Sequence, residues 1–233
     1  VSFVDFQGPS TRGETPDGLW SERVLTAVRA VSPKSAAQEI DLEVLSDFSL
    51  RKGCFTGAGF KAVIDDQSRL MAIADQSEAV LGLTIVVGTT TMALYLSDLA
   101  TGRTLARRHL ANPQASFGAD VISRMEAVQS SPDNLLLMRQ ALANGLNQAI
   151  RDALAETGHQ PNQILDAVVV GNPTMQHILM GLNPAPLARF PYLPNQPGTS
   201  SMPTSCLGMN MATGGRVGTL PMVSGHIGSD ALA

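Results

Sequence analysis

The residues best suited to chemistry form a short turn, Gly88-Thr89-Thr90-Thr91, between two apolar runs. The runs 83–87 and 92–96 predict two strands, so the segment is expected to be a β-hairpin. A turn of glycine and threonine can direct several backbone N–H groups and hydroxyls at one place, and fixed donors of this kind suit a phosphate. A hairpin without any ligand explains the same residues, and the turn alone favours that second interpretation.

Two further glycine turns follow predicted strands. Gly171-Asn172-Pro173-Thr174 comes after the apolar run 167–170, and Gly225-His226-Ile227-Gly228-Ser229-Asp230, a turn that starts at Gly225, comes after the apolar run 216–224. Ligands of an open α/β sheet gather at the carboxyl ends of its strands. Three glycine turns at three strand ends therefore favour one shared site.

Five polar side chains near these turns are candidates, each with a structural alternative. Asp120 and Arg124 are four residues apart on a predicted helix, so they either line a cleft or form a surface pair. Asn172 either contacts a ligand or stabilises its own turn. His177 either contacts a phosphate or a partner, or is packed in a helix. Asp230 either binds a metal or is stabilised by the N-terminus of a following helix.

The composition excludes several classes of function. The chain has 233 residues, is 44% hydrophobic and has a net charge of −4 without a long basic run, which disfavours nucleic acid as a partner. No apolar run approaches the roughly 20 residues that span a membrane. Cys54 and Cys206 are too few for an iron–sulfur cluster and predict free thiols in a reducing compartment, so we expect a cytoplasmic protein without a metal site. The chain starts without methionine and shows no secretory signal, which suggests a piece of a longer protein.

The first third of the chain predicts a linker and a small module. Residues 1–19 are rich in glycine, proline, serine and threonine and are expected to be a linker. Residues 20–80 are expected to form a small α+β domain. Within it, 20–31 is a helix or a strand pair, 38–50 a helix, and 60–64 and 70–74 two strands.

Residues 81–233 show a sharper pattern. After the hairpin we expect a third strand at 104–110, a helix at 117–128, and a longer helix that starts with a Ser131 hydroxyl cap and stops at Gly158. A buried strand, a helix, a long loop at 187–215, another strand and the start of a last helix follow. This α/β order is that of a ribonuclease-H-like fold, the half-unit of actin-like ATPases.

Four segments in this order resemble the ATP-dependent reductive activators of corrinoid iron–sulfur proteins, which belong to the superfamily of acetate and sugar kinases, Hsp70 and actin. The resemblance covers about 81–233 well and covers 20–79 only by position, as the family's small middle domain. The segments are Gly88–Thr91, Asn112-Pro113-Gln114 with Phe117–Arg124, Val170–His177, and Leu220-Pro221 with Gly228-Ser229-Asp230.

The resemblance implies a function and an assignment of residues. In such activators ATP hydrolysis drives electron transfer from a [2Fe–2S] domain to an inactive Co(II) corrinoid of a methyltransferase system and restores Co(I). The resemblance makes Gly88, Thr89, Thr90 and Thr91 the first phosphate loop for ATP with Mg²⁺. It places the segments 117–124 and 171–177 at the cleft or at the surface for a corrinoid protein, with a homodimer as a further option.

The sequence departs from the family pattern in three ways. The pattern expects an acid two residues before the glycine, where this chain has Val86, which offers no oxygen to a hard cation. The second phosphate loop does not occur within 233 residues, and neither do the cysteines of the cluster. We therefore expect this chain alone to be inactive. The alternatives are a degenerate binding or scaffold module and a fragment of a kinase-like phosphotransferase.

Overall fold

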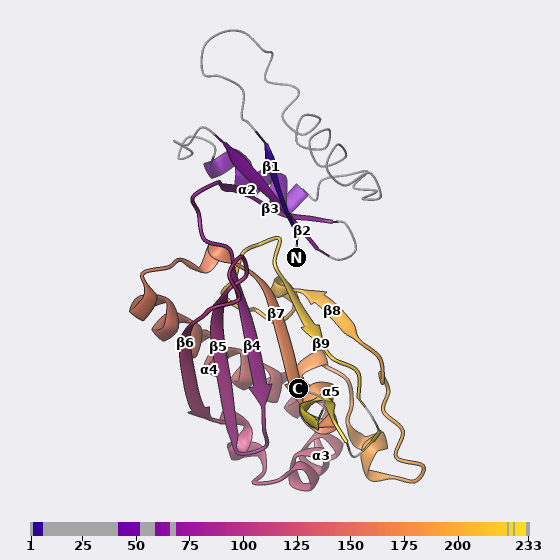
Figure 1. The fold of residues 1–233 in the computed structure, drawn as a ribbon. Coiled ribbons are helices and arrows are strands. Elements are labelled where there is room, and N and C mark those ends of the chain that lie inside the picture. The colour runs from indigo at the N-terminus through magenta and orange to yellow at the C-terminus, as the bar shows by residue number, and fades with distance from the viewer. Residues whose placement is uncertain are drawn as a thin grey trace. The chain divides into compact units, whose positions relative to one another are not determined.

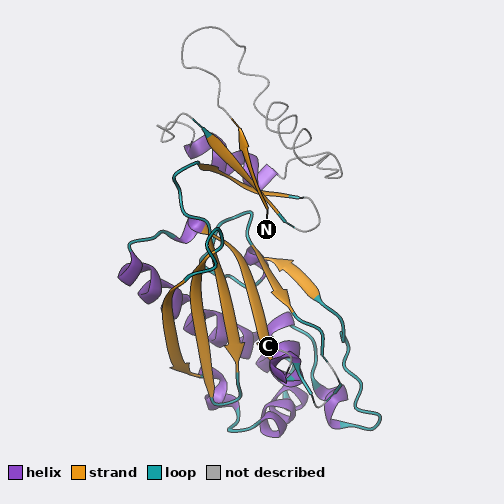
Figure 2. Cartoon of the chain, viewed as in Figure 1, coloured by secondary structure: helices purple, strands orange, loops and turns teal. Residues whose placement is uncertain are grey.

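The structure, a computed structural model, describes residues 2–6, 42–51, 59–65, 69–222, 224–225 and 227–231 (Figures 1 and 2). The chain divides into two compact units, one made of Val1–Ala79 with Thr213–Gly215 and the other of Val80–Ala212 with Arg216–Ala233. The sequence placed this boundary between 80 and 81. The element expected at 20–31 lies outside the described residues.

The first unit contains a three-stranded antiparallel sheet and one described helix. The strands β1 (Ser2–Phe6), β2 (Phe60–Ile64) and β3 (Leu70–Asp75) pair in the order β1-β2-β3, and α2 spans Leu42–Arg51. The strands at 60–64 and 70–74 and a helix within 38–50 are thus confirmed. The expected linker at 1–19 is wrong at its start, because β1 lies there. Its pairing partner, β2, is more than 50 residues away, so local composition could not indicate it.

The second unit is built on a mixed six-stranded sheet in the order β6-β5-β4-β7-β9-β8. The predicted hairpin and the third strand are confirmed as antiparallel neighbours, and β7 and β9 run parallel to β4. The edge strand β8 lies in the segment expected to be a loop; it is four residues long and ends in proline, so it lacks a strand pattern. The bounds are β4 (Leu81–Val87), β5 (Thr91–Asp98), β6 (Thr104–Ala111), β7 (Ile164–Gly171), β8 (Ser200–Pro203) and β9 (Arg216–Thr219).

The helices occur in the expected order, but two of them begin at a residue other than the predicted one. The helix expected at 117–128 begins only after Asp120, whose side chain caps it. The long helix begins at Asp133 with Pro132 as its N-cap, and no side-chain hydrogen bond caps it; it ends before Gly158, whose φ of 73° is left-handed. The helical elements of this unit are η2 (Pro113–Phe117), α3 (Val121–Ser130), α4 (Asp133–Thr157), η3 (Pro161–Gln163), α5 (Pro173–Met180), η4 (Ala185–Ala188), η5 (Thr204–Cys206) and η6 (Ser229–Ala231).

The core of this unit lies between one face of the sheet and α4 (Figure 2). Alternate residues of β4 and β5 are buried there, as are the α4 residues that recur every three or four positions, such as Met138, Leu142 and Leu146. Burying each such side chain contributes about 1.5–3 kcal/mol. This packing holds the carboxyl ends of β4 and β7 next to each other, where the two glycine turns begin. In the described part of the chain no helix is long and apolar enough to cross a membrane.

Candidate functional site

The turn between β4 and β5 is closed by one backbone hydrogen bond, from the Gly88 N–H to the Thr91 carbonyl at 3.0 Å. A Cβ atom on Gly88 would lie only 2.7 Å from that carbonyl oxygen, so the close approach requires glycine at this position. The regular register of β4 and β5 ends at Val87 and Met92. The turn is therefore a defined structure at the end of a rigid hairpin.

Three consecutive carbonyl groups of this turn are held from the same part of the chain. The Asn112 side-chain amide donates to the Gly88 carbonyl at 2.7 Å, and the Asn112 backbone N–H donates to the Thr90 carbonyl at 2.8 Å. The Arg124 guanidinium donates to the Thr89 carbonyl at 2.6 Å. In a planar trans peptide the N–H points opposite to the carbonyl. The N–H groups that share these peptides, those of Thr89, Thr90 and Thr91, therefore point away from Asn112 and Arg124.

These donors are available to a ligand. Among the described residues, the N–H groups of Thr89 and Thr90 and the Thr90 hydroxyl have no hydrogen-bond partner, and Thr90 is exposed. Backbone N–H groups that face one side in succession form a concave site for an anion. The geometry of the turn thus fits a phosphate oxygen better than it fits a cation.

Asn112 and Gln114 are functional candidates that were not among the site residues expected from the sequence. Asn112 is 1% exposed and also caps η2, since its Oδ1 accepts from the Gln114 N–H at 2.9 Å. The Gln114 side chain is buried and donates to the Met138 carbonyl at 3.2 Å. An asparagine before a proline is a helix-cap signal. That signal indicates a cap at Asn112, but nothing local in the sequence indicates its contact with a turn 24 residues earlier.

The Gly171-Asn172 turn lies directly beside the first turn. The Asn172 Oδ1 caps α5 by accepting from the Met175 N–H at 3.0 Å, and its Nδ2 donates to the Thr89 hydroxyl at 3.1 Å. Asn172 therefore stabilises its own turn, as the structural alternative predicted, and it also fixes a side chain of the candidate phosphate turn.

The third turn packs against the second. The Gly171 N–H donates to the Ser229 hydroxyl at 3.3 Å, and a Cβ on Gly228 would lie 2.1 Å from the Gly171 carbonyl oxygen and 2.8 Å from the Asp230 carboxylate. Asp230 is exposed at the start of η6. The structure thus brings Gly88–Thr91, Gly171 and Asn172 together at the carboxyl ends of β4 and β7, and Gly228 packs there with Asp230 beside it, although β9 ends earlier, at Thr219.

Asp120 and Arg124 do not form the surface pair that their spacing allowed. Asp120 accepts from the Ser123 N–H at 2.8 Å, and this hydrogen bond lowers the pKa of its carboxyl group. Arg124 is fully buried and contacts the turn. It therefore lies beneath the turn and does not line a surface cleft.

His177 does not face a partner or a phosphate. It is 0% exposed, its Nδ1 lies 2.7 Å from the Pro173 carbonyl, and its Nε2 accepts from the Asn195 N–H at 3.0 Å. Burial lowers the pKa of His177, so the neutral ring is favoured. His177 is a packed structural residue because both ring nitrogens are engaged inside the fold.

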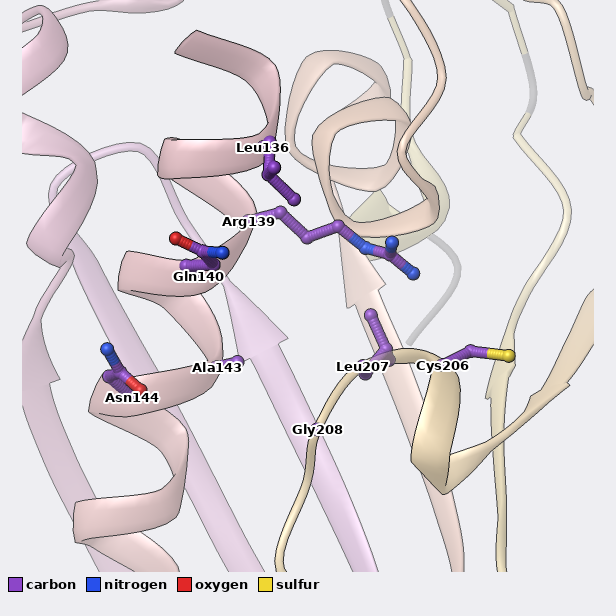
Figure 3. Close-up of a pocket in the computed structure, with 8 residues that line it drawn as sticks. All are labelled: Leu136, Arg139, Gln140, Ala143, Asn144, Cys206, Leu207 and Gly208. Carbon is purple, nitrogen blue, oxygen red and sulfur yellow. The ribbon is translucent and has the colours of Figure 1, made fainter. Parts of the chain in front are cut away.

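Two hollows flank α3 and α4. One, of about 280 Å³, borders Asn172 and is lined mainly by apolar side chains of α3, α5 and η4. The other, of about 450 Å³, lies between α4 and the 206–208 segment (Figure 3). Figure 3 shows Arg139 reaching across it from α4 while the Cys206 sulfur points away from α4. The Arg139 Nε donates to the Leu179 carbonyl at 3.0 Å, so this arginine supports the C-terminus of α5.

The described residues contain no cluster of three or more histidine, cysteine, aspartate or glutamate side chains that could hold a metal ion. Val86, the last residue but one before the turn, is half-buried on β4 and lies beside Ala93 and Val170. The turn itself therefore provides donors for an anion but no carboxylate for its counter-ion.

Comparison with known proteins identifies the family. The family described as RACo middle region matches residues 81–233, and the chain therefore belongs to it. This description applies the word middle to 81–233, whereas the resemblance had applied it to 20–79. The suspected relationship to corrinoid activators is thereby confirmed.

Two relatives agree with this family. The corrinoid activation enzyme RamQ of Eubacterium limosum is 28% identical over 159 residues, which are 68% of this chain and 27% of that protein. A solved structure, the reductive activator for corrinoid, iron-sulfur protein, has 27% identity and a TM-score of 0.80 over 99% of this chain and 37% of that one. The chain thus spans between a quarter and two fifths of these relatives.

Proposed function

We propose that this chain is the phosphate-binding part of an ATP-dependent reductive activator of a corrinoid protein. The single observation that carries the proposal is the turn Gly88–Thr91: Asn112 and Arg124 bind the carbonyls of Gly88, Thr89 and Thr90, and the N–H groups of Thr89 and Thr90 face outward. The names of the two relatives support the choice of a corrinoid protein as partner. The sheet order β6-β5-β4-β7-β9 supports a ribonuclease-H-like half-domain.

In this proposal the chain holds the phosphates of ATP and acts as part of a longer protein. Hydrolysis in that protein is coupled to transfer of one electron, which reduces Co(II) to Co(I) in the corrinoid of a methyltransferase system. The electron donor is a [2Fe–2S] cluster on another part of the protein, because a cluster needs four cysteine ligands and this chain has two cysteines. We place the assembly in the cytoplasm.

The residues present fit the phosphate better than they fit magnesium. The Thr89 and Thr90 N–H groups supply donors, and Asn172 orders the Thr89 hydroxyl. The Asp230 carboxylate lies next to Gly228, which packs against the Gly171-Asn172 turn, so we assign to Asp230 the orientation of the water shell of Mg²⁺. Val86 cannot do so, because a valine side chain has no oxygen.

The test is a titration of the protein with Mg·ATP, followed by calorimetry and by the backbone amide resonances of the turn. We expect the Thr89 and Thr90 amide resonances to shift at millimolar Mg·ATP. Shifts confined to other parts of the chain, or none at all, would contradict the phosphate assignment. For the partner, the longer protein is expected to reactivate a Co(II) corrinoid with a low-potential reductant only when ATP is added.

Val86 favours a second candidate, a module that binds nucleotide without hydrolysing it. The discriminating variant is Val86→Asp, which restores a carboxylate beside the turn. If the Val86→Asp chain gains Mg²⁺-dependent affinity for ATP over the parent sequence, the missing acid limits a working phosphate turn. If both bind ATP equally with and without Mg²⁺, binding alone is the function.

A further inference from the structure

Arg124 is the least expected residue of the site, because it is a fully buried cation without an acidic partner. Its side chain is 0% exposed, and no carboxylate of the described residues forms an ion pair with it. It instead meets neutral acceptors: the Thr89 carbonyl at 2.6 Å, the Gly118 carbonyl at 3.0 Å and the Gln114 Oε1 at 3.4 Å. Burial lowers the pKa of Arg124, but a guanidinium stays protonated in proteins.

Burying a charge is expensive unless it is paired. The helix cap Asp120 accepts from the Ser123 N–H and acts on Arg124 only as a charge at a distance, which raises the pKa of Arg124 less than burial lowers it. The direct partners of the guanidinium are therefore neutral acceptors. A hydrophobic residue of similar size is often more stabilising at such a position. The fold therefore retains a positive charge directly beneath the turn, at a cost in stability.

The bond from Arg124 to Thr89 acts on the next residue through the peptide plane. The Thr89 carbonyl and the Thr90 N–H belong to one planar trans peptide, so holding the oxygen inward keeps the N–H outward. A charge-assisted hydrogen bond to the carbonyl also polarises this peptide and strengthens the N–H as a donor. Arg124 thus acts on a ligand without touching it.

We propose that Arg124 is a positioning residue for the anion at the turn: it fixes the Thr89–Thr90 peptide with its N–H outward, and its unpaired charge raises the affinity for polyphosphate. This inference rests on the proposed phosphate site. A unit charge about 8 Å from an anion, at an effective dielectric constant of about 20, changes the affinity roughly 30-fold. The effect grows with the charge of the ligand.

The experiment measures binding of sodium tripolyphosphate and of inorganic phosphate by calorimetry to the parent protein, Arg124→Met, Arg124→Lys and Arg103→Met. Arg103 is exposed and its side chain has no hydrogen bond among the described residues, so Arg103→Met matches the change in net charge. We expect Arg124→Met to weaken tripolyphosphate binding on the order of 10- to 30-fold and inorganic phosphate binding less. Arg124→Lys is expected to recover part of the loss, and Arg103→Met to change little.

Several results would overturn the proposal. Equal losses for tripolyphosphate and inorganic phosphate would indicate a purely structural role, and an Arg124→Met protein that binds like Arg103→Met would show no role at all. If Arg124→Met does not fold, the test is made on the parent protein. The proposal then requires that the Arg124 Nε–H resonance of the parent shifts on addition of tripolyphosphate, and an unchanged resonance would contradict it. If the parent binds no phosphate at the turn, the proposed function fails first, and this inference with it.

Discussion

Asn112→Ala tests whether the Asn112 side chain fixes the Gly88 carbonyl of the turn, as the structure indicates. The substitution removes the donor to the Gly88 carbonyl and the acceptor of the Gln114 N–H, while the Asn112 backbone bond to Thr90 is retained. Each unsatisfied buried polar group costs about 1–3 kcal/mol, and Gly88 is half-buried, so we expect a loss of about 2–4 kcal/mol in the free energy of unfolding.

The assay is urea unfolding at equilibrium, with two companion variants. Asn112→Ser keeps an acceptor for the Gln114 N–H but cannot reach Gly88, so it is expected to recover about half of the loss. Asn144→Ala removes an exposed asparagine of α4 and is expected to stay within about 0.5 kcal/mol of the parent.

The same variants are then titrated with Mg·ATP. We expect Asn112→Ala to bind more weakly than the parent, because the Gly88 carbonyl is free to rotate and the Thr89 N–H with it. A loss of stability below about 0.5 kcal/mol for Asn112→Ala would refute the reasoning, because the side chain would then not hold the turn. Normal ATP binding by a destabilised Asn112→Ala protein would show that the outward N–H groups do not depend on it.

Three further predictions follow from other contacts. Gly228→Ala would place a Cβ 2.1 Å from a backbone oxygen and is expected to destabilise the protein by about 1–3 kcal/mol, whereas Gly198→Ala, with nothing closer than 3.8 Å, is expected to be neutral in the same thermal unfolding assay. Burial lowers the pKa of His177, so on acidification the unfolded chain binds a proton at this residue before the folded chain does. The free energy of unfolding should therefore fall as the pH drops below about 6.5, by at most about 1.4 kcal/mol per pH unit. An unchanged dependence of the free energy of unfolding on pH in His177→Gln would contradict this. Arg139→Gln removes the donor to a carbonyl at the end of α5 and is expected to cost about 1 kcal/mol in urea unfolding; no loss would show that Arg139 does not support this helix.

Much of the fold could be predicted because its signals are local. The hairpin around Gly88 follows from two apolar runs and a small-residue turn, and α4 follows from apolar positions that recur every three or four residues up to Gly158. Such patterns are set by neighbours in the chain. The strands β1 and β8 carry little local pattern, because each is short and is stabilised by a partner strand, β2 and β9 respectively.

The candidate site likewise has features that the sequence indicates and features that only the tertiary structure shows. The sequence by itself determined where the glycine turns lie, that they follow strands, and which family the chain resembles, because these depend on residue types and spacing. Only the tertiary structure decided which side chains hold the turn: Asn112 and Arg124 reach it from 24 and 35 residues away. It also decided that His177 is packed inside and that Arg124 is a buried cation, because burial and hydrogen-bond partners are set by contacts between distant segments.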